Sequence, residues 1–510
     1  MPSRDLPARA NLDHLKNEAK TLRKAFDEGD ATALQRVRDV LGDTSAIKLT
    51  DAQRVVAREY GFPTWARLRD HVQTSQGIEE SVGAFLNAVH EQDLERAKRV
   101  LGSHPNIAKE SLHVASVLGL ADDARRLIAE DPARVSERIG KPTADPLLLL
   151  CYSPFHGESP ERDAGLLDTA RVLLDAGANP NTTDDRYNVP ALYAVTGMRS
   201  VLPIARLLLD AGANPTDGES VFHAAEHNNV DALELLLASG ANLNFVGDWG
   251  NTALYFLLRW HDLEREARVR AGLVWLLEHG ADPNVPSGKE RENALHVAVR
   301  RGQSADVIRL LLEHGADVNA RRGDGSTPWL IAKRAGLDDI ASLLESAGAE
   351  TTELSPADLL LAACARGDVD AARRLSSPAL IEALEPSDRV LLPDSATAGR
   401  ASTALACVAA GFPVNTLDHM GATALHHAAI SGDASLVRAL LDAGSDITIR
   451  DNEHSATPLG WALFGVDHVK GSPGDYAGSV RALLDAGARR RDDEYLPKDA
   501  RVRAVLRTRG

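Results

Sequence analysis

The chain has 510 residues, of which 44% are hydrophobic, 25% charged and only 4% aromatic, so it is too long for one compact core and has a soluble protein's composition. Its formal net charge of -16 repels nucleic acid and anionic membranes, which disfavours both as partners. The three cysteines lie far apart and form no CxxC motif, which argues against a disulfide framework and for a reducing, cytoplasmic location. We also expect no secretion signal and no membrane span, since no long apolar stretch occurs.

Residues 1–76 form a segment of their own. Leu12, Leu15, Ala19, Leu22 and Phe26 recur at helical spacing, and the turn sequence EYGFPT separates a second helical pattern from a third. The spacing predicts a small helical unit. We expect this unit to cover the apolar end of the array that follows it, with a separate binding role as the alternative.

One short token recurs along the rest of the chain: two leucines, two or three residues, then Gly-Ala or a close variant. It reads LLDAGANPN around Gly177, LLEHGADPN around Gly280 and LLDAGSDIT around Gly444. The other copies surround Gly212, Gly240, Gly315, Gly348, Gly411 and Gly487. Their spacing gives a period near 33 residues with insertions and one double step of 63, which contains the degenerate copy ADLLLAACARGDVDAARRL. Each glycine predicts a helix end, where the chain adopts the left-handed conformation.

A second token follows several of these glycines by about 12 residues, as in NALHVAV (293–299), TPWLIA (327–332) and TALHHAA (423–429). Its Thr predicts a helix cap, and Pro or Ala suits the first turn. Together the two tokens resemble the ankyrin repeat, whose pattern is TPLHxAxxxG, a second helix and then LLxxGAxxN. The resemblance runs from roughly Ser81 to Glu494, and the N-terminal helical leader suggests a bacterial-type member of the family.

The resemblance implies an all-α ankyrin solenoid of about twelve repeats, each made of two antiparallel helices and a projecting β-turn finger. We expect an N-terminal capping unit at 1–76, a first array at 77–355 and a second array at 356–494 that continues the stack. A charged helix or tail is expected at 495–510. The function that the resemblance implies is protein–protein interaction by rigid presentation of a concave surface.

The resemblance also places a binding column on that surface, at the two residues before the glycine that ends each inner helix. Four consecutive repeats hold arginine there: Arg259, Arg300, Arg334 and Arg366. Nearby or in earlier repeats, the column holds Tyr152, Met198, His227, Trp260 and Arg301. At a helix spacing of about 10 Å, the four arginines would form a basic track about 30 Å long. We therefore expect a protein partner that offers an acidic peptide or another anionic group.

Two further tryptophans favour binding, because Trp and Arg are common hot-spot residues. Trp249 lies in the finger sequence VGDWGNT and Trp461 on the inner helix of TPLGWALFG. Core packing is an equal alternative for Trp461, and pairing with acidic residues of the next repeat is the alternative for the arginines. Three insertions, which follow Tyr152, Trp260 and Phe464, are either specificity loops or neutral surface loops.

The sequence predicts no catalytic residue, metal site or cofactor, since no HExxH, GxSxG or GxxxxGK[ST] motif occurs. The resemblance assigns turn-bracing roles to four histidines, His113, His223, His296 and His426. His427, next to the last of them, is expected at the surface. The alternative function is an enzyme or small-molecule binder that holds an anionic substrate in a cleft lined by His227, Arg259, Arg300 and His427. The oligomeric state is left open.

Overall fold

The computed structural model describes residues 4, 6, 11–260, 262–263, 266–469, 474–490 and 495–509. It divides into an N-terminal unit, Met1–Asn242, and a C-terminal unit, Leu243–Gly510. The described residues form helices, and their only extended pairing consists of isolated β-bridges such as Ser287 with Glu292. None of the helices in these ranges is long and apolar enough to cross a membrane.

Four helices begin the N-terminal unit: α1 (Leu12–Asp27), α2 (Ala31–Leu41), α3 (Leu49–Glu59) and α4 (Trp65–His90). Their buried side chains form one hydrophobic cluster that runs from Leu15 to Val72 and contains no residue of the repeats. The predicted boundary at residue 76 falls inside α4, which also packs against α5, α6 and α7. These first helices thus have a core of their own, and their capping role stays a prediction.

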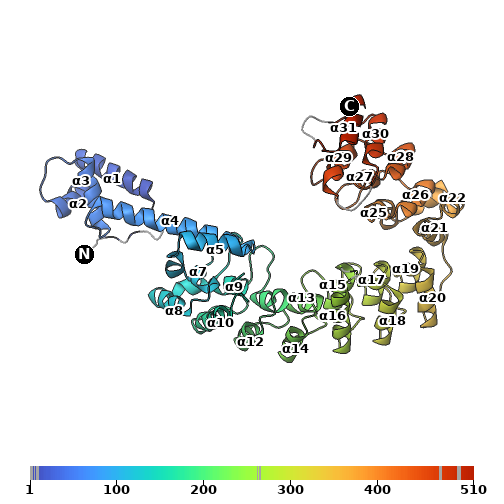
Figure 1. Cartoon of the computed structure of the whole chain (residues 1–510), viewed down its shortest axis with the longest axis horizontal. Coiled ribbons are helices and arrows are strands. Elements are labelled where there is room, and N and C mark those ends of the chain that lie inside the picture. The colour runs from blue at the N-terminus through green and yellow to red at the C-terminus, as the bar shows by residue number, and fades with distance from the viewer. Residues whose placement is uncertain are drawn as a thin grey trace. The chain divides into compact units, whose positions relative to one another are not determined.

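The remaining helices of this unit alternate between two rows (Figure 1). The inner row is α7 (Leu112–Val117), α9 (Pro146–Cys151), α11 (Ala191–Tyr193) with the π-helical turn η2 (Ala194–Met198), and α13 (Ser220–Glu226). The outer row is α8 (Ala121–Glu130), α10 (Pro160–Asp175), α12 (Leu202–Asp210) and α14 (Val230–Ala238). Three further helices complete the unit: α5 (Leu94–Ser103), α6 (Ile107–Glu110) and the 3-10 helix η1 (Pro132–Ser136).

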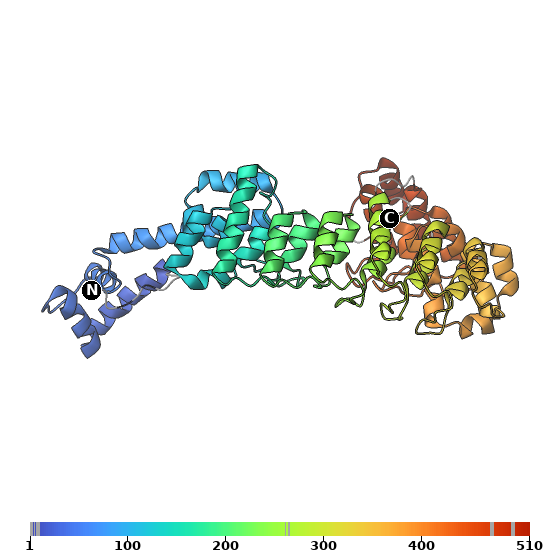
Figure 2. The ribbon, with the colours of Figure 1, turned by 90° about the horizontal axis from the view of Figure 1, so that it is seen from below.

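The C-terminal unit repeats the same two-row arrangement, and its helices stand side by side in Figures 1 and 2. Its inner row is α15 (Ala253–Trp260), α17 (Ala294–Arg300), α19 (Pro328–Arg334), α21 (Pro356–Ala365), α25 (Leu391–Thr397), α27 (Ala424–Ile430) and α29 (Pro458–His468). Its outer row is α16 (Ala267–Glu278), α18 (Ala305–Glu313), α20 (Asp338–Ser346), α22 (Val369–Leu375), α26 (Ala401–Ala409), α28 (Ala434–Asp442) and α30 (Tyr476–Asp485). The short helices α23 (Pro378–Ala383) and α24 (Pro386–Arg389) lie between α22 and α25, and α31 (Ala500–Arg509) ends the chain described.

Both tokens form the structures expected of them. Every glycine of the leucine token has a φ between 84° and 97°, the left-handed region that ends a helix at low cost. Thr327 caps α19 by accepting a hydrogen bond from the backbone N–H of Leu330, and Thr457 caps α29 in the same way. The double step in the period contains two helix pairs, α21 with α22 and α25 with α26, of which only the second ends in a token glycine.

The asparagine that ends the leucine token links successive fingers. The Asn284 side chain donates to the carbonyl of Gly315 at 2.8 Å and accepts from the N–H of Asp317 at 2.7 Å. Asn319 makes the same two bonds to Gly348 and Glu350, at 3.1 and 2.7 Å. Each finger is therefore fixed by the finger before it, which holds the ends of the inner helices in register.

Candidate interaction surface

The predicted arginine column lies at the C-terminal ends of four consecutive inner helices. Arg259 is in the last turn of α15, Arg300 ends α17, Arg334 ends α19, and Arg366 is the C-cap residue of α21. These helices pack in sequence, α15 on α17, α17 on α19 and α19 on α21. A cation at a helix C-terminus is also favoured by the helix dipole, so this placement by itself is no evidence of binding.

Arg300 is engaged inside its own repeat. Its guanidinium forms a bidentate pair with Glu292, with N–O distances of 2.8 and 2.7 Å. Arg322 binds the same carboxylate at 3.1 Å. Although burial raises the pKa of Glu292, its hydrogen bonds to Arg300 and Arg322 outweigh this effect and lower the pKa overall. Arg300 is therefore neutralised within the fold.

Arg334 and Arg366 pair with acids of neighbouring repeats. Arg334 binds Asp358 of the following inner helix, and Arg366 lies 3.6 Å from Asp338 of the preceding outer helix. Lys333 shares Asp338 at 2.8 Å. These pairs match the structural alternative for the arginines, in which charges of adjacent repeats pair with each other.

Arg259 and Arg301 differ from the other arginines, because neither forms an ion pair with any residue that the structure describes. Arg259 instead stacks over the rings of Tyr255 and Trp260, with its Cζ 5.7 and 4.9 Å from the two centroids. Desolvation and the positive charges of Arg300 and Arg259 lower the pKa of Arg301. Among the described residues, the guanidinium groups of Arg259 and Arg301 thus have no ion-pair partner where α15 meets α17.

The predicted tryptophans fall into two classes. Trp249 and Trp260 are exposed, at 74% and 59% of their surface, which is unusual for side chains that large. Trp461 is half-buried on α29, where its Nε1 donates to Asp451 at 3.0 Å and its ring packs edge-on against His426 and His427. Packing therefore accounts for Trp461, while Trp249 and Trp260 have surface to offer a partner.

His227 belongs to the N-terminal unit. It is exposed at the end of α13, and its Nδ1 lies 2.9 Å from the carbonyl oxygen of His223. The remaining predicted site residues are all in the C-terminal unit. The structure therefore places His227 in a different unit from the other predicted site residues.

Three of the four histidines that were expected to brace turns do so. The Nε2 atoms of His113, His296 and His426 lie 2.7, 3.1 and 3.3 Å from carbonyl oxygens of the following finger. His223 differs, because its Nδ1 lies 2.7 Å from Glu226 and its Nε2 lies 3.3 Å from Glu219. Burial lowers the pKa of His223, but the bonds to both glutamates outweigh it and raise the pKa to about 9.

The expectation that His427 lies at the surface is wrong. Its side chain is buried, and its Nε2 lies 2.7 Å from Asp418, whose other oxygen accepts from the N–H groups of Met420 and Ala422. This pair braces a finger, and Trp461 packs against it, so a substrate has no access to the imidazole. His427 therefore cannot line the cleft of the alternative function. The described ranges contain no cluster of side chains that could hold a metal.

The three insertions lie where the sequence placed them, between inner and outer helices. Residues 153–165 contain a loop and the first turns of α10, and 261–272 contain the start of α16. The third, 465–479, begins with the last turn of α29 and ends in α30. Residues 261, 264–265 and 470–473 of these insertions lie outside the described residues, as do Glu494 and most of the first ten residues.

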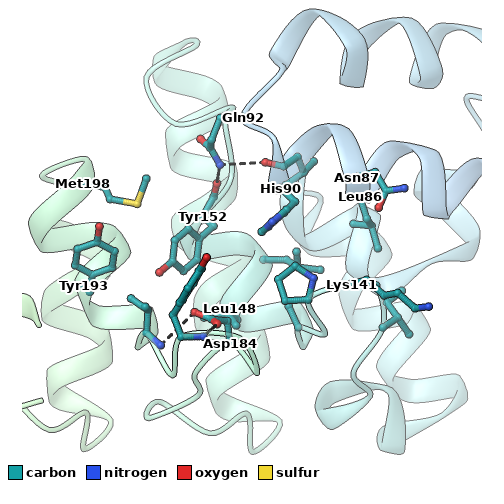
Figure 3. A pocket seen from close by; sticks show the side chains of 18 residues that line it. Leu86, Asn87, His90, Gln92, Lys141, Leu148, Tyr152, Asp184, Tyr193 and Met198 are labelled. Carbon is teal, nitrogen blue, oxygen red and sulfur yellow. Dashed lines mark hydrogen bonds between the residues drawn. The ribbon is translucent and has the colours of Figure 1, made fainter. Parts of the chain in front are cut away.

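A cavity that the sequence analysis did not identify lies in the N-terminal unit (Figure 3). Its volume is about 250 Å³, and it lies between α4, α9 and η2 and the fingers at 139–144 and 184–189. Its lining includes Leu148, Tyr152, Tyr193 and Met198. Tyr152 and Met198 occupy the same column as the arginines, so the repeat register could have indicated part of the cavity lining. The two fingers that complete the lining could not be predicted in this way, because their contribution depends on the tertiary structure.

Comparison with known proteins identifies ankyrin repeats in three segments. Residues 221–265 and 274–332 match families described as ankyrin repeats in many copies, and residues 420–452 match the single ankyrin repeat. These matches agree with the all-helical two-row fold. The chain therefore contains ankyrin repeats; the number of repeats stays a prediction.

Proteins of quite different kinds share this similarity. The E3 ubiquitin-protein ligase KEG of Arabidopsis thaliana is 31% identical over 273 residues, 48% of this chain and 16% of that protein. Ankyrin repeat and SOCS box protein 11 of Danio rerio is 34% identical over 125 residues, 24% of this chain and 38% of that protein. The nuclear factor NF-kappa-B p105 subunit of Gallus gallus is 31% identical over 137 residues, which are 26% of this chain and 13% of that protein. The chain thus spans well under two thirds of each relative, and none of these relatives is bacterial.

Proposed function

Because the chain contains ankyrin repeats, we propose that it is a protein-interaction module whose partner binds the inner-helix surface of the C-terminal unit. Repeats of this kind hold their binding side chains in place before the partner arrives, so little ordering entropy opposes association. The partner we propose is an acidic peptide segment. The contact residues would come from the arginine column and from Trp249 and Trp260.

The observation that carries this proposal is the contrast within the column. Arg300, Arg334 and Arg366 already have carboxylate partners, so an incoming acid would have to compete with them. Arg259 and Arg301 have no such partner in the described part of the chain, and the exposed ring of Trp260 lies beside Arg259. Two arginines without carboxylate partners, next to an exposed tryptophan, favour a partner segment in which an acidic residue adjoins an apolar one.

The remaining arginines would act on the approach of the partner. Ion pairs at a rim contribute little to affinity but steer association, and their effect falls as salt increases. We propose that Arg334 and Arg366 have this lesser role. The affinity of the complex would then depend mainly on Arg259 and Arg301.

We also propose that the chain works in a reducing compartment such as the cytoplasm and keeps the predicted architecture of about twelve repeats behind an N-terminal cap. The support for the compartment is that all three cysteines are buried free thiols. Burial raises the pKa of Cys151 well above its ordinary value, which leaves that thiol unreactive. A bacterial origin also stays part of the proposal.

The test is a binding titration of the full chain with a fluorescein-labelled peptide of alternating Glu and Leu, followed by fluorescence anisotropy. The double variant Arg259→Glu/Arg301→Glu should weaken binding about tenfold or more and reduce its salt dependence. The matched control is Arg309→Glu, which reverses the charge of an exposed arginine on the outer helix α18. Equal binding by wild type and double variant, or an equal loss in the control, would show that the column is not the site.

A further inference from the structure

The cavity of the N-terminal unit is lined mainly by apolar and aromatic side chains. Figure 3 shows Leu148 at its base, Tyr152 and Tyr193 on one side and Leu86 on the other. The two tyrosine rings have centroids 6.4 Å apart and planes tilted by 51°. Fixed apolar walls of this kind favour a bound group that is itself apolar.

The size of the cavity limits what can enter it. Its volume of about 250 Å³ is below the roughly 300–1,000 Å³ of pockets that enclose a drug-sized molecule. It is suited to one large side chain, such as Phe, inserted from a segment that continues along the surface. A single anchor inserted in a pocket is the usual arrangement at the centre of a protein interface.

Two polar groups in these walls lack partners. Neither the Tyr152 nor the Tyr193 hydroxyl forms a hydrogen bond with a residue that the structure describes. Burial raises the pKa of both hydroxyls, so both keep their protons and can donate. A peptide backbone offers carbonyl oxygens to such donors, whereas a purely aliphatic ligand would leave them unsatisfied.

The charges around the cavity favour an acid next to the anchor. Lys141 and His90, which are exposed in its lining, form no ion pair with any described residue. The acid in the lining, Asp184, is occupied by the backbone N–H groups of Arg186, Tyr187 and Val189. Among the residues that the structure describes, the charge of the Lys141 ammonium in the lining is therefore unpaired.

A second cation adjoins the cavity. Arg199 follows Met198 and binds Gln92, whose side chain also donates to the carbonyls of Val89 and Tyr152 (Figure 3). The Nε atom of Arg199 is buried without a hydrogen-bond partner, and burial lowers the pKa of the Arg199 guanidinium. A half-buried arginine whose Nε lacks a hydrogen bond, and which has no carboxylate partner among the described residues, is in an unfavourable environment that an acid brought by a partner would relieve.

We propose that this cavity binds one large apolar side chain of a protein segment whose next residue is acidic. The acidic residue pairs with Lys141, Arg199 adds positive charge beside the cavity, and the tyrosine hydroxyls donate to the backbone of the segment. The inference rests on the proposed function only in taking the partner to be a protein. Its residues belong to the N-terminal unit and are separate from the arginine column.

Saturation-transfer NMR of the full chain with blocked tetrapeptides tests the proposal. The probe is Ac-Gly-Phe-Asp-Gly-NH2, and the comparison peptides replace Phe with Ala or Asp with Asn. A single anchor should bind with a millimolar Kd. The Phe-Asp peptide should give the strongest transfer, with its largest effect on the aromatic ring, and the Ala-Asp peptide should give almost none.

Variants at exposed positions separate the parts of the proposal without disturbing the core. Tyr187→Ala truncates a side chain that lines the cavity and is 60% exposed. It should weaken binding of the Phe-Asp peptide several-fold or more. Lys141→Glu should remove the preference for Asp over Asn. The double variant Arg259→Glu/Arg301→Glu should bind the peptide as wild type does, so that failure of the arginine surface and failure of this cavity can be distinguished. Absence of transfer, equal binding by Tyr187→Ala, or equal binding of the Asn peptide by wild type would overturn the inference.

Discussion

Histidine at one repeat position has two roles, and the neighbours of the ring decide which. His296 is buried between the cap residue of its own helix and the carbonyl of Ser326 in the next finger. Burial lowers its pKa, so the ring is neutral and acts as a bridge. His223 occupies the same position but meets two glutamates. Its raised pKa means that it is an imidazolium at neutral pH.

This difference predicts a stability that depends on pH. The folded-state pKa of His223 is about 9, above the unfolded value of about 6.5. The stabilisation is therefore complete below about pH 6.5 and is lost as the pH rises toward 9. Between these values the free energy of unfolding should fall by on the order of 1–2 kcal/mol, after allowance for solvent screening.

The measurement is urea denaturation, followed by circular dichroism, at several pH values between 6.5 and 9. In His223→Gln the decrease should be smaller than in wild type. His296→Gln is the matched control, because His296 is already neutral in this range, and it should keep the wild-type slope. The assignment fails if His223→Gln keeps that slope too.

At the scale of the element, the finger is stabilised by the finger before it. The β-bridges within a finger are single pairs, too short to be stable alone. The asparagine of the leucine token supplies the missing support, since its amide bonds both to the glycine carbonyl and to a backbone N–H of the next repeat. The sequence shows that this asparagine recurs. Its hydrogen bonds to the next repeat are known only from the tertiary structure, in which the two repeats are in contact.

Asn284→Ala should therefore destabilise the C-terminal unit. It removes the hydrogen bonds to Gly315 and Asp317 and a longer one of 3.4 Å that Asn293 donates. The N–H of Asp317 and the carbonyl of Gly315 lose these partners, at an expected cost of about 1–3 kcal/mol. The unfolding midpoint in urea measures the change. Asn106→Ala is the control, because Asn106 is exposed and its side chain caps no helix, and it should leave the midpoint unchanged. A midpoint equal to wild type in Asn284→Ala would mean that water replaces these bonds without loss.

At the scale of the whole molecule, stability should be local. In stacked repeats each unit contacts mainly its neighbours, so the free energy is close to a sum of nearest-neighbour terms. The helices α1 to α3 should also be stabilised locally, since their hydrophobic cluster ends at Val72 and contains no residue of the repeats. A defect in the middle of the array should not reach them.

Leu295→Ala tests this locality. Leu295 is fully buried in α17, and its truncation should cost about 2–5 kcal/mol. Hydrogen exchange followed by mass spectrometry should show faster exchange in α15 to α20 and unchanged exchange in α1 to α3. Leu359→Ala, at a 41% exposed leucine of α21, is the control and should change neither region. Faster exchange throughout the chain would instead indicate one cooperative core.

The sequence by itself determined the fold class and the position of most helix ends. A glycine that ends a helix and a Thr that begins one are local signals, because the left-handed φ and the capping hydrogen bond involve residues close together in the chain. The column register of Arg259, Arg300, Arg334 and Arg366 followed from the same periodicity. The 63-residue double step was harder, because α22 ends in the described fold without a token glycine.

Only the tertiary structure decided which of these side chains are free. Arg300 and Arg259 are equivalent in the repeat, yet Arg300 has a carboxylate eight positions earlier in its finger and Arg259 has an aromatic ring. His427 adjoins a predicted structural residue but is buried with Asp418. The N-terminal cavity forms where two fingers meet α4, α9 and η2. Ion pairing, burial and cavities depend on contacts between residues far apart in the chain, which a periodic pattern does not specify.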